Sequence, residues 1–371
     1  MTTDTRRAVA ATLRHAAGFA ELTGRIGSEI AALVQDVHAA SSPVALVTAR
    51  APAPAIYGGI RLGFGGARRL AALGGRIAPR DPPPDAWLDV QSALNGVFGH
   101  LYEPEGGFAL PMSLHPTPDT RRAERLLVFL HGLCMNERCW ERPAHARFVA
   151  WARERAGLAV AYLRYNTGLR ISRNGGLLAD LLEQEAPARQ IVLVGHSMGG
   201  LVALSALHQA QERGLAWPRR VARVACLGSP HEGASLERIG NHANRLLSVS
   251  AWSRPFMRLG NLRSDGIRDL RFGHLLEADW RGRPADHSRP APSAVRLAAH
   301  VDHLLVAATR SARGEADPLG DWLVPVPSAL ARNLHPAAAA RRELIPGLGH
   351  MGLLGDERVY RLLRAWSERR A

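Results

Sequence analysis

The first candidate for chemistry is a serine, Ser197, which lies between glycines in the segment GHSMGG at 195–200. This segment directly follows the apolar run IVLV, a predicted strand, and begins a predicted helix. A serine on a sharp turn between strand and helix projects its hydroxyl above the sheet, and glycines on both sides keep the turn free of collisions. We therefore interpret Ser197 as a nucleophile, against the alternative of an ordinary Gly-Ser turn. Its neighbour His196 is interpreted as a structural or pocket-lining residue.

Acyl transfer to a serine requires two backbone N–H groups that face the developing oxyanion. One is expected from Met198, the residue that follows the serine. The other is expected from a loop after an earlier strand. Here the apolar run LLVFL at 126–130 leads into His131, Gly132 and Leu133, which gives Leu133 that position. Gly132 allows a tight turn, and His131 can brace the loop.

Serine also needs a general base at neutral pH. A histidine that follows both the serine and an acid in the chain is the expected base for this arrangement. His350 lies in GLGHMG at 347–352, after the last expected strand, on a loop whose glycines allow an approach to Ser197. Other histidines in this half of the chain fit less well, because they lie in an expected insertion, at a strand or beside a proline: His274, His287, His300, His303 and His335.

The acid that orients the base should follow the expected strand at 303–309. Glu315, Asp317 and Asp321 are the candidates. Asp321 begins the segment DWLVP, whose apolar residues could fix the loop, and we expect it to be the acid. Asp317, before Pro318, is the main competitor, and a simple turn is its structural alternative.

From about residue 106, apolar strand-like runs alternate with helical segments, which predicts an α/β fold with a mainly parallel sheet flanked by helices. The runs at 108–114 and 125–130 are joined by a turn that contains Pro and Asp. Further strands are expected at 158–165, 190–196, 221–228, 303–309 and 343–346. Helices are expected at 176–185, 200–211 and 357–369.

Two regions depart from this alternation. Residues 234–298 mix apolar side chains with arginines and predict an inserted helical cap on the domain at 106–371. Residues 1–105 predict a helical N-terminal region without a catalytic signature. It contains an amphipathic stretch at 6–39, a glycine-rich segment at 57–77 and a linker at 80–85.

Composition narrows the classes of partner. The net charge is +14, but all 47 basic residues are arginine and they are spread along the chain, so we expect no nucleic acid as a partner. The three cysteines are odd in number and lack metal-ligand spacing, which argues against a disulfide framework and against a metal site. Together with the lack of an apparent signal peptide, this favours a cytoplasmic location. The sequence contains no run of about 18 apolar residues, so we expect no membrane-spanning helix. A peripheral membrane contact through the N-terminal region or the cap stays open.

The ordered set of motifs resembles bacterial lipases and esterases of the α/β-hydrolase superfamily, and the broader triacylglycerol-lipase and GPI inositol-deacylase-like group. The resemblance covers about residues 106–371 and rests on HGL at 131–133, GHSMGG at 195–200, GSPHEGASLERIGN at 228–241, GDWLVPVPSA at 320–329 and GLGHMGLL at 347–354. It implies the α/β-hydrolase fold, a triad of Ser197, Asp321 and His350, and oxyanion donors at Leu133 and Met198. Some secreted members carry a signal peptide, a disulfide or calcium, and this sequence supports none of these; we expect no cofactor and no metal.

The expected function is therefore hydrolysis of a carboxylic ester through an acyl-enzyme on Ser197. The apolar residues of the cap suggest a hydrophobic or lipid-like substrate, with a core of the cap itself as the alternative. An acyltransferase or thioesterase would use the same triad, and a non-catalytic scaffold with this fold is a rival of another class.

Overall fold

The computed structural model describes residues 85–102, 109–116, 123–235, 264–282, 295–312, 320–332 and 340–369. The chain divides into two compact units, one of Met1–Gln91 and Leu101–Leu110 and the other of Ser92–His100 and Pro111–Ala371. The N-terminal segments at 6–39, 57–77 and 80–84 lie outside the described residues. The domain boundary near residue 105 therefore stays a prediction.

The second unit contains a seven-stranded sheet in the order β1-β3-β2-β4-β5-β6-β7. All neighbouring strands are parallel except β1 and β3. The central strands are almost continuously apolar because helices cover both of their faces. The strand bounds are β1 Ser113–Pro116, β2 Arg125–Leu130, β3 Leu158–Arg164, β4 Gln190–His196, β5 Val221–Leu227, β6 Asp302–Thr309 and β7 Ala340–Pro346.

The α/β fold with a mainly parallel sheet is confirmed, and the first strand differs in its place and length. The sequence analysis expected a strand at 108–114 joined by a turn to the run at 125–130. The observed β1 covers Ser113–Pro116 and pairs antiparallel with β3. Both edges of β2 are already occupied by β3 and β4, so β1 lies at the edge of the sheet, where Pro116 is tolerated.

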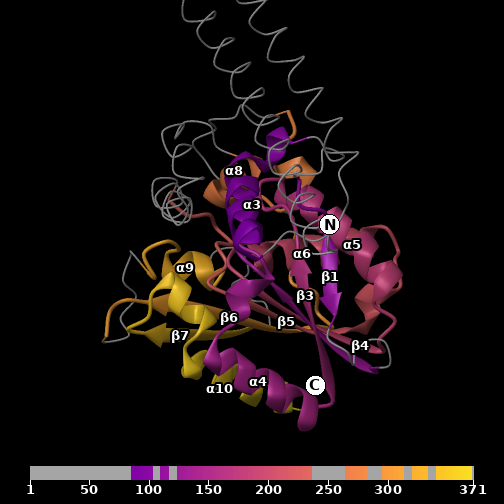
Figure 1. Cartoon of the computed structure of the whole chain (residues 1–371), viewed down its shortest axis with the longest axis vertical. Helices are drawn as coiled ribbons and strands as arrows, with labels where there is room; N and C mark the ends of the chain where they lie inside the picture. The colour runs from indigo at the N-terminus through magenta and orange to yellow at the C-terminus, as the bar shows by residue number, and fades with distance from the viewer. Residues whose placement is uncertain are drawn as a thin grey trace, which may run out of the picture. The chain divides into compact units, whose positions relative to one another are not determined.

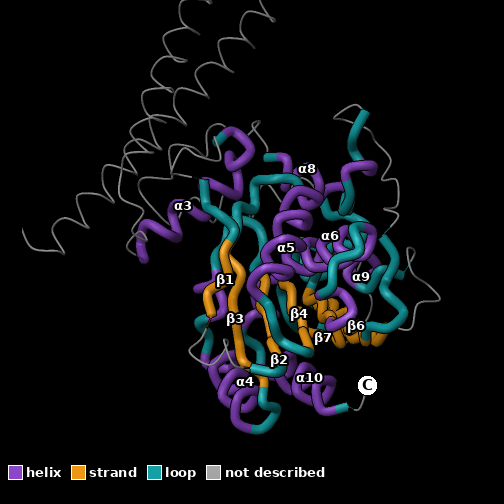
Figure 2. The backbone as a smooth tube through the Cα atoms, turned by 90° about the vertical axis from the view of Figure 1, so that its right-hand side faces the viewer, coloured by secondary structure: helices purple, strands orange, loops and turns teal. Residues whose placement is uncertain are grey.

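Helices cover the two faces of the sheet in pairs. On one face α4 (Pro143–Glu154) lies beside α10 (Glu357–Glu368), and on the other α5 (Ile171–Glu185) packs along α6 (Met198–Glu212), as the two views show (Figures 1 and 2). The other α-helices in the described ranges are α3 Asp85–Phe98, α8 Asp265–Phe272 and α9 Val326–Ala329. The 3-10 helices are η2 Gly99–Leu101, η4 Glu137–Trp140, η5 Trp217–Arg220, η7 Glu277–Asp279 and η8 His350–Leu354.

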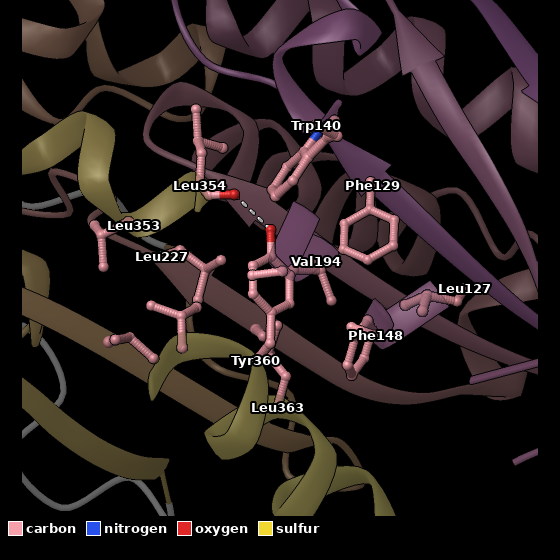
Figure 3. Close-up of a cluster of buried hydrophobic side chains, with 14 of the residues drawn as sticks. Leu127, Phe129, Trp140, Phe148, Val194, Leu227, Leu353, Leu354, Tyr360 and Leu363 are labelled. Carbon is pink, nitrogen blue, oxygen red and sulfur yellow. Dashed lines mark hydrogen bonds between the residues drawn. The ribbon is translucent and has the colours of Figure 1, made fainter. Parts of the chain in front are cut away.

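The core on the α4 and α10 face supports the loop that carries His350. Alternate residues of β2, Leu127 and Phe129, point into this core, where they join Phe148 of α4 and Leu363 of α10 (Figure 3). Tyr360 of α10 donates its hydroxyl to the carbonyl of Leu354, with an O···O distance of 2.7 Å. Leu354 is the last residue of the 3-10 helix η8, which begins at His350. The buried hydrogen bond from α10 therefore fixes the end of this turn.

The expected cap at 234–298 is described in part. Its described residues contain the helix α8 and the turn η7, and no strand. Ser264 begins α8 as its N-cap, with its hydroxyl accepting from the N–H of Ile267. No helix in the described part of the chain combines the length and the apolar character that crossing a bilayer requires.

Candidate active site

Ser197 occupies the sharp turn between β4 and α6 that the sequence analysis predicted. Its backbone has φ 54° and ψ −120°, a conformation that non-glycine residues rarely adopt. A Cβ on Gly195 would collide with the backbone of Gly200, so the turn requires glycine at that position. The N–H of Ser197 donates to the carbonyl of Leu227 on β5 at 2.8 Å, which holds the strained turn to the sheet.

His350 and Asp321 are paired. Nδ1 of His350 lies 2.7 Å from Oδ2 of Asp321, and both side chains are buried. The other carboxylate oxygen of Asp321 accepts from the N–H groups of Leu323 and Val324, at 2.9 and 2.8 Å. The N–H of His350 also donates to the backbone carbonyl of Asp321 at 3.2 Å. The carboxylate therefore has a fixed orientation toward the imidazole, while Glu315 and Asp317 lie outside the described residues.

Ser197 and His350 line one pocket. The apolar part of its wall consists of Leu133, Met135, Pro230, Ala234, Leu270, Leu323 and Val324. Its free volume is about 10 Å³, about the room that one water molecule needs. The structure thus brings the expected nucleophile, the expected base and the expected acid to one small, largely apolar site.

The loop after β2 also reaches this pocket. Leu133 lines it, and a Cβ on Gly132 would come within 3.2 Å of Cβ of Ser197. Cys134 has a left-handed backbone, with φ 62°, and its N–H donates to Oγ1 of Thr167 at 3.0 Å. Because this N–H is engaged, Leu133 is the better source of an oxyanion donor from the loop. Met198, the other expected donor, is the first residue of α6, where N–H groups have no partner within the helix.

Two buried histidines brace the site. His131 stacks on Tyr165 with ring centroids 4.4 Å apart, and the Tyr165 hydroxyl donates to the His131 carbonyl at 2.7 Å. Burial lowers the pKa of His131 to about 4, so the ring is neutral at pH 7. Nε2 of His196 lies 3.2 Å from the carbonyl of His350, with the two rings 4.7 Å apart. His196 thus links the turn that carries Ser197 to the backbone of His350.

Sequence reasoning missed the residues that support the loop after β2. Tyr165 and Thr167 contact it from the segment that follows β3, and Arg164 pairs with Glu137 at its far end. Arg164, Tyr165 and Thr167 lie in the segment RYNTG at 164–168, to which the sequence analysis assigns no role. Its polar and aromatic residues directly after a buried strand are the signal that could have indicated this role.

The described cysteines offer no rival nucleophile. All three are free thiols, and burial raises the pKa of Cys134 and of Cys226 to about 12 and that of Cys139 further. Thiols with such pKa values stay protonated and unreactive at neutral pH. Within the ranges that the structure describes, no group of three or more His, Cys, Asp or Glu residues could hold a metal ion.

Solved structures with a similar fold include several bacterial enzymes. The mature lipase BlEst2 of Bacillus licheniformis is 21% identical, with a TM-score of 0.44, covering 69% of this chain and 98% of that one. The carboxylesterase CesB of Bacillus subtilis is 13% identical, with a TM-score of 0.45, covering 76% and 96%. A thermophilic esterase of Thermogutta terrifontis is 16% identical, with a TM-score of 0.41, covering 69% and 93%. Likenesses this distant say nothing about the reaction.

The sequence itself gives a firmer assignment. No functionally curated protein matches it significantly. One family model does match, over residues 127–362, a range that begins in β2 and ends in α10 and contains all five expected site residues. This range is more than half of the chain, and it coincides with the parallel sheet and its covering helices. The chain therefore belongs to the alpha/beta hydrolase family.

Proposed function

We propose that this hydrolase cleaves carboxylic esters through an acyl-enzyme on Ser197. The observation that carries the proposal is that Ser197 and His350 line the same buried pocket while Asp321 holds the far nitrogen of the imidazole. A hydroxyl, an imidazole and a carboxylate in this order are the parts that acyl transfer to serine requires. Membership in the alpha/beta hydrolase family supports a reaction of this class.

In the first half of the reaction His350 acts as the general base. With Nδ1–H directed at Asp321, its Nε2 takes the proton of Ser197 as the serine oxygen bonds to the ester carbonyl carbon. Asp321 stabilises the imidazolium that forms. The bond between the carbonyl carbon and the alcohol oxygen then breaks, and Nε2 returns its proton to the departing alkoxide. Water repeats the sequence on the acyl-enzyme and releases the acid.

Backbone N–H groups stabilise the charge that develops on the carbonyl oxygen. Leu133 and Met198 supply them from the loop after β2 and from the start of α6. Both residues are buried, so the two donors act in a low dielectric, where a preformed hydrogen bond contributes more than in water. The strained turn at Ser197 keeps the hydroxyl next to these donors.

The pocket wall also bears on the substrate. Its side chains are mainly aliphatic, which supports an apolar group next to the ester carbonyl. Its free volume of about 10 Å³ supports a short group, so among the hydrophobic or lipid-like substrates expected from the sequence a small ester has more support than one with a long acyl chain.

Labelling with a fluorophosphonate tests the proposed nucleophile. This probe phosphonylates an activated serine, so we expect the wild-type protein to be labelled and Ser197→Ala to lose both the label and hydrolysis of p-nitrophenyl acetate. Ser205→Ala is the matched control, because Ser205 is also buried and lies on α6, the helix that Ser197 directly precedes. Labelling that persists in Ser197→Ala, or that disappears only in Ser205→Ala, would contradict the proposal.

A further inference from the structure

One part of the wall of the pocket beside Ser197 comes from α8, which lies within the expected cap at 234–298. Leu270 of α8 lines the pocket and is 3% exposed. Its backbone carbonyl accepts from the N–H of Ala234, another pocket residue, at 3.0 Å. Among the described residues, α8 contributes one aliphatic side chain, Leu270, to the wall of this pocket.

The start of α8 is packed tightly on the segment that follows β3. The N–H of Gly266 donates to the carbonyl of Gly168 at 3.2 Å, and a Cβ on Gly266 would collide with the carbonyl of Thr167. Ser264 donates its buried hydroxyl to the carbonyl of Gly96 at 2.6 Å. Asp265 pairs with Arg170 at 3.0 Å. These contacts leave the first turn of the helix little freedom to move.

A buried carboxylate next to Leu270 anchors the rest of α8. Asp269 is fully buried, and its two oxygens have separate partners. Oδ1 accepts from Nη1 of Arg170 at 2.7 Å, and Oδ2 accepts from the N–H of Ile171, the first residue of α5, at 2.8 Å. Moving α8 away would leave a carboxylate and a helix N-terminus without these partners, which is costly in a buried place. The helix is therefore a fixed wall.

A narrow pocket with buried walls suits the acyl group better than the alcohol. The alcohol must leave while the acyl group remains bonded to Ser197, so the alcohol needs a path to solvent and the acyl group does not. The apolar wall residues are buried, and the free volume is about that of one water molecule. Each additional methylene of the acyl chain must displace the wall, and Leu270 is the residue that α8 contributes to this wall.

We propose that Leu270, held in place by the Asp269 anchor, limits the substrates of this enzyme to esters of short acyl groups, acetyl to propionyl. This inference rests on the proposed ester hydrolysis and adds its substrate class and the residue that determines it. Leu270 contacts the acyl group and takes no part in the proton transfers, so its removal is expected to change the ratio of the kcat/KM values for short and long acyl esters.

The test compares p-nitrophenyl acetate, butyrate and octanoate in the wild-type enzyme, in Leu270→Ala and in Ile267→Ala. Ile267 is a matched control, because it is a buried aliphatic residue one turn earlier on α8 that does not line the pocket. We expect the wild-type kcat/KM to fall at least ~10-fold from acetate to octanoate, a discrimination of the size that hydrophobic pockets achieve. Leu270→Ala should remove most of this fall, while Ile267→Ala keeps the wild-type ratio.

Two further readouts separate the possible failures. Active sites are counted with the fluorophosphonate, so that a loss of folded protein is not taken for a change in preference. If no ester is hydrolysed and Ser197 is not labelled, the proposed function is wrong. If hydrolysis and labelling occur but Leu270→Ala keeps the wild-type chain-length ratio, or Ile267→Ala changes it equally, the Leu270 proposal is wrong. A response only to the size of the alcohol, measured with acetate esters of graded alcohols, also overturns it.

Discussion

At Asp321 the two carboxylate oxygens have different partners. Oδ1 accepts two backbone N–H groups of its own turn, and Oδ2 faces Nδ1 of His350. A carboxylate can only accept, so the proton between the two side chains belongs to Nδ1 and the lone pair of the imidazole belongs to Nε2. The backbone turn thus determines which nitrogen of His350 is basic.

Asp321→Asn, which replaces one carboxylate oxygen by an amide nitrogen, tests whether Asp321 determines the tautomer of His350. The asparagine amide can donate to Nδ1, which stabilises the tautomer with its proton on Nε2 and removes the base. We expect kcat to fall by about 10⁴ with little change in KM, as expected when the orienting acid of such a triad is replaced by its amide. Steady-state kinetics on p-nitrophenyl acetate, together with the circular dichroism spectrum as a check on folding, measures the effect.

Asp317→Asn is the control for this substitution, because Asp317 is the competing acid of the sequence analysis. We expect its kcat to stay within about twofold of the wild-type value. The assignment of Asp321 would be wrong if Asp317→Asn lost activity and Asp321→Asn kept it.

At the scale of elements, the loop after β2 depends on the segment after β3. Thr167 accepts from the N–H of Cys134, whose left-handed backbone is unfavourable for a side chain with a Cβ. Tyr165 holds the carbonyl of His131 at the start of the same loop. Leu133 thus lies between His131 and Cys134, whose backbones are fixed by these hydrogen bonds, and it lines the same pocket as Ser197.

Thr167→Val should misplace the Leu133 donor. Valine has nearly the same shape as threonine but cannot accept the Cys134 N–H, so a buried donor is left without its partner and the strained turn can relax. We expect kcat to fall about 10- to 100-fold with little change in KM, because an oxyanion donor acts mainly in the transition state.

Thr167→Ser restores the hydroxyl and should recover most of kcat. A purely structural role would instead lower the number of fluorophosphonate-reactive sites and leave kcat per site unchanged in the valine variant. That result, or a serine variant as slow as the valine variant, would mean that Thr167 does not position the oxyanion donor.

Most elements could be predicted from the sequence where a local pattern encodes them. Apolar runs of strand length gave β2 to β6, because burial on both faces demands continuous apolar side chains. The start of α5 was expected at Gly176 but lies at Ile171. Its N-terminal N–H is capped by Asp269, which is 98 residues away in the chain. A helix that a distant carboxylate caps carries no local start signal, so its first turn could not be recognised.

In the site, too, residues placed by the fold could be predicted, while residues placed by contacts between distant segments could not. Ser197, His350 and Leu133 follow strands, so their convergence at one edge of a parallel sheet follows from the fold. The contacts of Thr167, Leu270 and Asp269 depend on how loops and α8 pack, and no spacing in one sequence encodes that packing. The apolar residues at 234–298 suggested a hydrophobic or lipid-like substrate, but composition does not tell which of them lines the pocket.

For the molecule as a whole, buried neutral histidines make stability depend on pH. His131 and His145 each have a pKa lowered by burial from 6.5 to about 4. In the unfolded chain their pKa returns to about 6.5, so between pH 6.5 and 4 the unfolded state binds protons that the folded state does not bind. The contribution of the two neutral histidines to the free energy of unfolding is therefore fully present above about pH 6.5 and is lost as the pH falls toward 4. Over the upper part of this range the carboxylates remain largely ionised, so the loss there comes from the histidines.

His145 gives the cleaner test, because it lies on α4, away from the candidate site, with its Nε2 2.9 Å from the hydroxyl of Tyr162. His145→Gln keeps a hydrogen-bonding side chain but does not titrate. Between pH 7.5 and pH 5 we expect the free energy of unfolding to fall by about 2 kcal/mol less in the variant than in the wild type. Urea unfolding at the two pH values measures this difference, whatever stability the variant loses at pH 7.5 through its lost ring packing. Parallel losses in both proteins would mean that His145 is protonated in the folded state or titrates alike in both states, and that other groups cause the acid sensitivity.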